Sequence, residues 1–80
     1  MRIALNDTVH IVNDGWIVDG TVSGLADDNV DVDYGDVIVR YSKDDMAERW
    51  EYYSQDTVLT PTSEGTIVRD YRTDPTFRRM

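Results

Sequence analysis

The stretch Asn29-Val30-Asp31-Val32-Asp33-Tyr34 decides the fold class, because apolar and polar residues alternate strictly along it. Successive side chains of a β-strand point to opposite faces, so the pattern predicts a strand with one buried and one solvated face. After a turn at Gly35-Asp36, a second alternating run places three more side chains on the inner face: Val37, Val39 and Tyr41. We therefore expect a β-sheet with a valine-rich core.

Further strands are predicted on both sides of this stretch, at residues 7–12, 16–25, 50–53 and 57–60, and residues 66–72 alternate well enough for another. Turn signals such as Asn13-Asp14-Gly15 separate these runs. Residues 44–51 lack β character, and we expect Asp44 or Asp45 to cap a short helix through residues 46–48. Pro61 is expected at an edge or at the end of a strand.

This order of elements resembles the small SH3-like barrel of Tudor and KOW-type domains. The resemblance covers residues 5–62 and is carried by the step Gly20-Thr21-Val22, the acidic hairpin, the valine-rich strand, the aromatic strand and the last short strand, Asp56-Thr57-Val58-Leu59. It implies a mainly β fold, an SH3-like barrel of about five strands with one short helical turn. We divide the chain into an acidic barrel (1–65) and a basic C-terminal extension (66–80) that forms an extra strand or a docking arm.

The resemblance also implies a barrel that presents a surface to a partner. Tudor domains bind methylated side chains in an aromatic cage, and KOW domains bind RNA through a basic loop. The matching loops here, near Asp14-Gly15-Trp16 and Asp27-Asp28-Asn29, are acidic. A cage would draw on Trp16 and Tyr53, which border turns and are the aromatic residues most expected to be exposed.

Charge is distributed unevenly along the chain. Residues 3–39 contain eight aspartates and no lysine or arginine, whereas residues 66–80 contain four arginines and two aspartates. Binding to nucleic acid or to an anionic membrane depends on cationic side chains, so we expect neither for the body of the protein. A partner protein with a basic surface is favoured instead, for instance one that itself binds nucleic acid.

No enzyme, cofactor or metal site is predicted. The chain has no cysteine, its serines lie outside any Gly-x-Ser-x-Gly motif, and its one histidine, His10, is expected to be an exposed or half-buried strand residue. Residues 27–36 superficially suggest a calcium loop. An EF-hand counted from Asp27 needs glycine at its sixth position and glutamate at its twelfth, but Val32 and Ile38 occupy them.

The aspartate-rich surface has three interpretations: a solvated outer face, an adaptation to high salt, or mimicry of nucleic acid. Outward carboxylates two residues apart on a strand are separated by about 6.6–6.8 Å, close to twice the axial rise per phosphate of one DNA strand. Under the third interpretation the protein is an accessory or inhibitor protein of a virus that blocks a nucleic-acid-binding host protein. The residues that we expect to contact the partner are Asp14, Trp16, Asp27, Asp28, Asp31, Asp33 and Asp36.

The alternative function is a structural or assembly subunit that forms homo-oligomers through its C-terminal arm. Five residues of the extension would carry this contact: Arg69, Arg72, Phe77, Arg78 and Arg79. No apolar run approaches the length of a membrane span, and Met1 to Asp7 turns polar before a signal-peptide core could form. We therefore expect a cytoplasmic protein, located in the host cytoplasm if it is viral.

Overall fold

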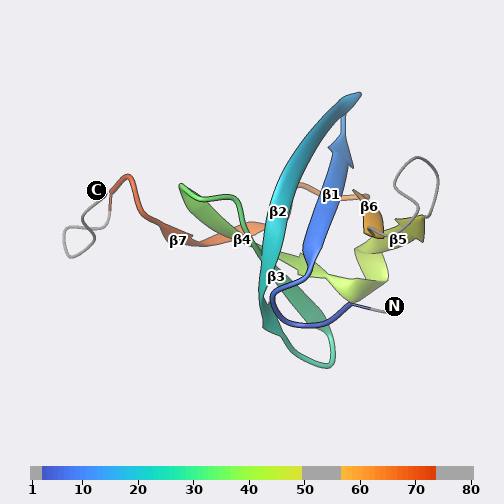
Figure 1. The fold of residues 1–80 in the computed structure, drawn as a ribbon, viewed down its shortest axis with the longest axis horizontal. Helices are drawn as coiled ribbons and strands as arrows, with labels where there is room; N and C mark the ends of the chain where they lie inside the picture. The colour runs from blue at the N-terminus through green and yellow to red at the C-terminus, as the bar shows by residue number, and fades with distance from the viewer. Residues whose placement is uncertain (1–2, 50–56, 74–80) are drawn as a thin grey trace.

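The computed structural model describes residues 3–49 and 57–73, with the backbone alone for residues 48 and 49. These residues form one seven-stranded sheet with the order β5-β6-β1-β2-β3-β4-β7 (Figure 1). Neighbouring strands are antiparallel except β1 and β6, which are parallel. The strands are β1 (Thr8–Asn13), β2 (Trp16–Leu25), β3 (Asn29–Asp33), β4 (Val37–Ser42), β5 (Met46–Arg49), β6 (Thr57–Pro61) and β7 (Thr66–Asp70).

Strands β3 and β4 confirm the alternation predicted from the sequence. Val30 and Val32 are fully buried, whereas the polar residues between them are partly exposed. In β4, Val39 and Tyr41 are buried beside them, opposite Val32 and Val30 respectively. The core is completed from three other strands by Val9, Ile11, Val22 and Leu59.

The β1–β2 hairpin extends beyond the rest of the sheet. Its two-residue turn has positive φ angles at both Asp14 (50°) and Gly15 (81°), the conformation that matches the right-handed twist of a hairpin. Residues 16–20 of β2 pair with β1, but the pairing of β2 with β3 begins only at Thr21. The half of β2 nearest the turn therefore has no strand on its other side, and the hairpin projects from the body in Figure 1.

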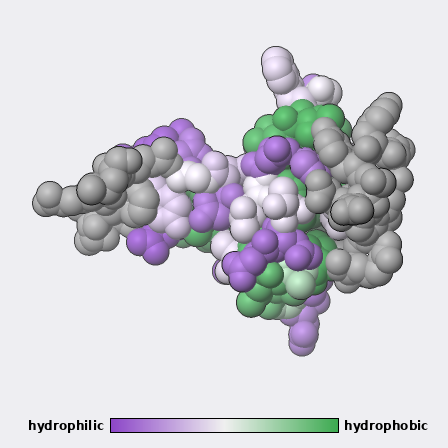
Figure 2. Space-filling view, viewed as in Figure 1, coloured by the Kyte–Doolittle hydropathy of each residue, from purple (hydrophilic) through white to green (hydrophobic). Residues whose placement is uncertain are grey.

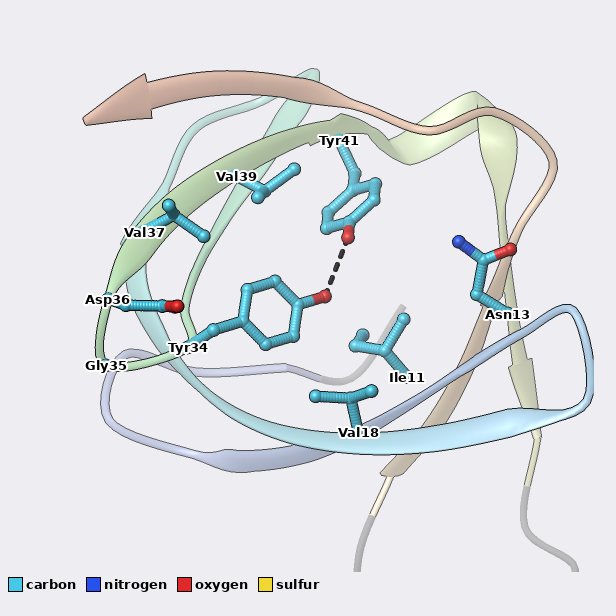
Figure 3. A pocket seen from close by; sticks show the side chains of 9 residues that line it. All are labelled: Ile11, Asn13, Val18, Tyr34, Gly35, Asp36, Val37, Val39 and Tyr41. Carbon is cyan, nitrogen blue, oxygen red and sulfur yellow. Dashed lines mark hydrogen bonds between the residues drawn. The ribbon is translucent and has the colours of Figure 1, made fainter. Parts of the chain in front are cut away.

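Strand β2 carries two features that go with the bending of the sheet, a closely packed glycine and a bulge. A Cβ atom at Gly20 would overlap the Val32 side chain, so only glycine allows β3 to approach β2 so closely at this point. The register between the two strands also shifts between Val22 and Gly24, and a bulge of this kind bends a strand and increases its twist. In Figure 3 the strands curve around a concave inner face.

The mainly β class is confirmed, but the described residues do not close into an SH3-like barrel. Strands β5 and β7 are the two edges of an open sheet. The predicted strands at 57–60 and 66–72 are present as β6 and β7, and Pro61 is the last residue of β6. The aromatic strand predicted at 50–53 lies outside the described residues.

The helix predicted through residues 46–48 is wrong. A 3-10 turn occupies Lys43–Asp45 instead, and its cap is Ser42, whose hydroxyl accepts a hydrogen bond from the amide of Asp44. Met46 is already extended and begins β5, which pairs with β6. Pairing with β6, the next strand along the chain, together with the packing of Met46 on the core, overrides the local capping signal.

Strand β7 is an edge strand with little burial of its own. Among the strands that the structure describes it pairs with β4 alone, and four of its five residues are exposed. Ile67, opposite Val39, is 55% exposed, and Val68 is 42% exposed. The extension predicted from residue 66 is therefore part of the same sheet as far as Asp70, and residues 71–73 form a turn after it.

A candidate binding cleft

A cleft of about 630 Å³ opens on the concave face, between the projecting hairpin and the β3–β4 turn. Figure 3 shows its side chains pointing toward one another from β1, β2, β4 and the β3–β4 turn. Most of the lining is apolar or aromatic, and the volume falls in the range of small-molecule and side-chain pockets. The lining residues are Ile11, Asn13, Val18, Tyr34, Gly35, Asp36, Val37, Val39 and Tyr41.

Two tyrosines meet inside the cleft. The hydroxyl groups of Tyr34 and Tyr41 are hydrogen-bonded at 2.7 Å (Figure 3). Burial, and secondarily the hydrogen bond and the charge of Tyr41, raise the pKa of Tyr34 above its ordinary value. Both rings present mainly apolar surface to the cleft, with their hydroxyl groups already paired with each other.

The cleft exists because the hairpin is longer than its neighbour. Val18 lies opposite Ile11 in the hairpin, beyond the end of the β2–β3 pairing, and is 47% exposed. Trp16 lies opposite Asn13, a lining residue, and is 75% exposed. The inner face of the hairpin thus carries apolar side chains that the body of the protein does not cover.

The polar lining of the cleft is acidic. Asp36 contributes to the wall, and the nearby Asp33 accepts a hydrogen bond of 2.7 Å from the Gly35 amide, which fixes the β3–β4 turn. Of the seven predicted partner-contacting residues, Asp36 is the one that lines the cleft. Asp33 alternates with the buried Val32, so it lies on the outer face of β3 and lines a neighbouring hollow with Thr8 and Asp19. Asp14 and Trp16 belong to the hairpin that forms its other side.

The other three predicted residues lie elsewhere. Asp27 and Asp28 are in the β2–β3 turn, at the opposite end of β3 from the cleft. Asp31 lies on the outer face, and its two carboxylate oxygens accept hydrogen bonds of 2.8 and 3.1 Å from Arg40, its cross-strand neighbour. The hydrogen bond and the charge of Asp31 raise the pKa of Arg40, as expected for an ion pair. The row of carboxylates along β3 is therefore neutralised near its middle.

Of the five predicted self-association residues, the structure describes two, Arg69 and Arg72. Arg69 lies over the ring of Tyr71, 5.1 Å from its centroid, and Arg72 donates two hydrogen bonds of 3.0 Å to Asp70. The Arg72 hydrogen bonds hold the pKa of Asp70 below its usual value. Phe77, Arg78 and Arg79 lie outside the described residues.

Exposed apolar surface is not confined to the cleft. Figure 2 shows hydrophobic residues gathered in two regions of one face, separated by hydrophilic and neutral residues. Large exposed apolar residues lie on the hairpin and on β7. On the hairpin they are Trp16, Ile17 and Val18, and on β7 they are Ile67 and Val68.

His10 is buried, not exposed or half-buried as predicted. Its Nδ1 lies 2.5 Å from a carboxylate oxygen of Asp19, the residue opposite it in β2, while its other neighbour in the sheet is Val58 of β6. The parallel docking of β6 beside β1, which local sequence does not indicate, accounts for this burial. In the described ranges, no three His, Cys, Asp or Glu side chains group as metal ligands.

The sequence analysis did not identify Asn13 and Val18 as site residues, because Asn13 belongs to a turn signal and Val18 is one of two valines in the predicted strand at 16–25. The available signal was a mismatch in strand length. The run at 16–25 is twice as long as the run at 29–33 with which it pairs, so its first half had to lack a partner on one side.

No helix in the described ranges combines the length and apolar character needed to cross a membrane. We compared the chain with protein-family models, with curated proteins and with solved structures, and none of them matches it.

Proposed function

We propose that this protein is a non-catalytic protein-binding module that holds an apolar side chain of its partner in the cleft. The observation that carries this proposal is an open cleft of about 630 Å³ with apolar walls on a protein of only 80 residues. Burying an aromatic or aliphatic side chain there would remove both its surface and that of the walls from water, at about 25 cal/mol per Å² of apolar area.

The acidic side of the cleft selects the flanking residues of the partner. Asp36 lines the cleft, on a protein with a formal net charge of −8. Such a field attracts cationic segments and repels anionic ones, and it acts more on association rate and specificity than on final affinity. The partner segment is therefore an apolar residue flanked by arginine or lysine.

Inhibition of a nucleic-acid-binding host protein is the narrower form of this proposal. The ion pair between Asp31 and Arg40 weakens a continuous row of phosphate-like charge along β3. The remaining acidic residues at the cleft still suit a basic partner, and a nucleic-acid-binding protein offers one. In this form the apolar contact in the cleft fixes the position, and the carboxylates supply attraction.

Selection from a displayed library of random peptides tests the proposal directly. Peptides enriched on the wild-type protein should carry an aromatic or aliphatic residue next to arginine or lysine. The same selection on Val18→Glu should lose them, while Ile17→Glu should retain them. Val18 and Ile17 are adjacent in the hairpin and equally exposed (47% and 48%), but only Val18 lines the cleft. Equal enrichment on both variants, or none on the wild type, would refute the proposal.

A second candidate function is that of an assembly subunit, and the exposure of Ile67 and Val68 on the edge strand β7 favours it. Edge strands offer unpaired backbone groups to a neighbouring chain. Light scattering over a range of concentrations measures this assembly. Assembly is supported if the wild-type protein has a mass above that of one chain and the Val68→Lys variant has the mass of one chain. A wild-type monomer at every concentration would exclude it.

A further inference from the structure

The described chain ends beside the cleft. Strand β7 runs antiparallel to β4, and just after it the amide of Tyr71 donates a 2.9 Å hydrogen bond to the carbonyl oxygen of Asp36. Asp36 is one of the lining residues of the cleft. The chain therefore leaves the sheet at the acidic side of the proposed binding site, and whatever follows Thr73 starts from there.

The seven residues that follow have the chemistry expected of the partner. Their sequence is Asp74-Pro75-Thr76-Phe77-Arg78-Arg79-Met80. Phe77 is the only phenylalanine of the protein, and two arginines follow it directly in a chain that is otherwise strongly acidic. An aromatic side chain followed by cations is the kind of segment that an apolar cleft with Asp36 in its wall would hold, on a chain with a formal net charge of −8.

We propose that the C-terminal segment of the same chain is an occupant of the cleft, with Phe77 inside it and Arg78 and Arg79 near its acidic side. This inference rests on the proposed function, because it assigns an occupant to the same site. It adds regulation: the protein carries its own competitor, and an external partner binds only by displacing it.

Reach and effective concentration both favour the same chain over a second copy. The turn after β7 holds Thr73, whose amide donates a 3.2 Å hydrogen bond to the carbonyl oxygen of Asp70, so the reach is counted from Thr73. Four Cα–Cα steps lead from Thr73 to Phe77, and when extended they span up to about 14 Å. Tethering by so short a segment gives an effective concentration in the millimolar range, so at lower protein concentrations the attached segment outcompetes the segment of another molecule. The cost is the ordering of a few residues.

A spin label at position 80 tests the proposal in the 80-residue chain. The chain contains no cysteine, so Met80→Cys creates a single attachment site for a nitroxide while leaving Phe77 and both arginines in place. Methyl NMR signals of Val18 and Val37, which line the cleft, should broaden, and those of Leu25 at the far end of β2 should not. Adding Phe77→Ala should remove most of the broadening, whereas Thr76→Ala should preserve it.

The outcomes separate this inference from the proposed function. Equal broadening with and without Phe77→Ala would overturn the inference. Broadening that appears in isotope-labelled wild-type protein when spin-labelled, unlabelled protein is mixed in would overturn it too, because the occupant would then be a second copy. If selected peptides bind the cleft although Phe77 does not, the function stands and the inference fails. If the same peptides displace the label, both are supported.

Discussion

The phenolic oxygens of Tyr34 and Tyr41 lie 2.7 Å apart, and their hydrogen bond joins the β3–β4 turn to the last part of β4 across the interior of the cleft. Tyr41 is 5% exposed and belongs to the core, whereas Tyr34 packs against the core from its margin. The cleft therefore has a wall of aromatic side chains whose positions are fixed by each other.

Replacing Tyr34 by phenylalanine should lower the free energy of unfolding by about 0.5–1.5 kcal/mol, because the Tyr41 hydroxyl then loses its partner in a partly buried site. Urea denaturation followed by circular dichroism measures the loss. Tyr41→Phe should cost a similar amount, and the double variant less than the sum of the two. Strict additivity would contradict a shared hydrogen bond.

Alkaline pH should destabilise the wild-type protein more than Tyr34→Phe. The pKa of Tyr34 is raised in the folded protein, chiefly by burial, so the folded state holds this proton more tightly than the unfolded state does. The stabilising contribution is therefore complete below the unfolded pKa of about 10 and is lost as the pH rises above it. Thermal melts between pH 8 and pH 11 measure Tm for the wild type and for Tyr34→Phe. If Tm falls with pH by the same amount in both proteins, the prediction is refuted.

Gly65→Ala should destabilise the protein by about 1–3 kcal/mol more than Gly35→Ala. Both glycines have positive φ angles (74° and 96°), so both substitutions incur the cost of the left-handed region. A Cβ atom at Gly65 would also lie 2.7 Å from Val39 and 2.8 Å from Tyr41, whereas at Gly35 it would meet nothing within 4 Å. Chemical denaturation of both variants measures the two losses in the free energy of unfolding. Equal losses would contradict the prediction, because they would show that the backbone before β7 shifts at no cost to make room for the Cβ atom.

Asp36→Asn should weaken the binding of a selected basic peptide about 1.5- to 5-fold, corresponding to 0.2–1 kcal/mol for an exposed charge pair. Asp27→Asn removes the same charge at the other end of β3 and should have a smaller effect. Titration calorimetry at low and high salt measures both. The difference should shrink as salt increases, and a salt-independent loss would point to a steric cause.

Local pattern was sufficient for part of this fold. The alternation in β3 and β4 fixes which side chains are buried whatever the strands pair with, and the turn at Asp14-Gly15 fixes the hairpin. The place of β6 could not be predicted, because the parallel pairing of His10 with Val58 joins segments far apart in the chain. Met46 begins a strand, although the preceding aspartates suggest a helix, because it pairs with Pro61 of β6, the strand that follows.

The cleft was hidden from sequence reasoning for a related reason. Val18 has the pattern of a core residue, and whether it is covered depends on where β3 ends. The outward position of Asp31 was predicted, but its pairing with Arg40 follows from the β3–β4 register, which alternation alone does not give. The chemistry of a surface thus depends on register as well as on composition.

The parallel contact between β1 and β6 sets an order for folding. Strands β1 to β4 follow one another in a meander of short turns and can pair as soon as they meet, but Val9 can meet Thr57 only after that whole meander has been bridged. Closing so long a loop costs chain entropy before any contact compensates for it. On a ribosome, the N-terminal strand must wait with one edge bare until Pro61 has emerged, and in this interval the nascent chain is open to wrong pairings.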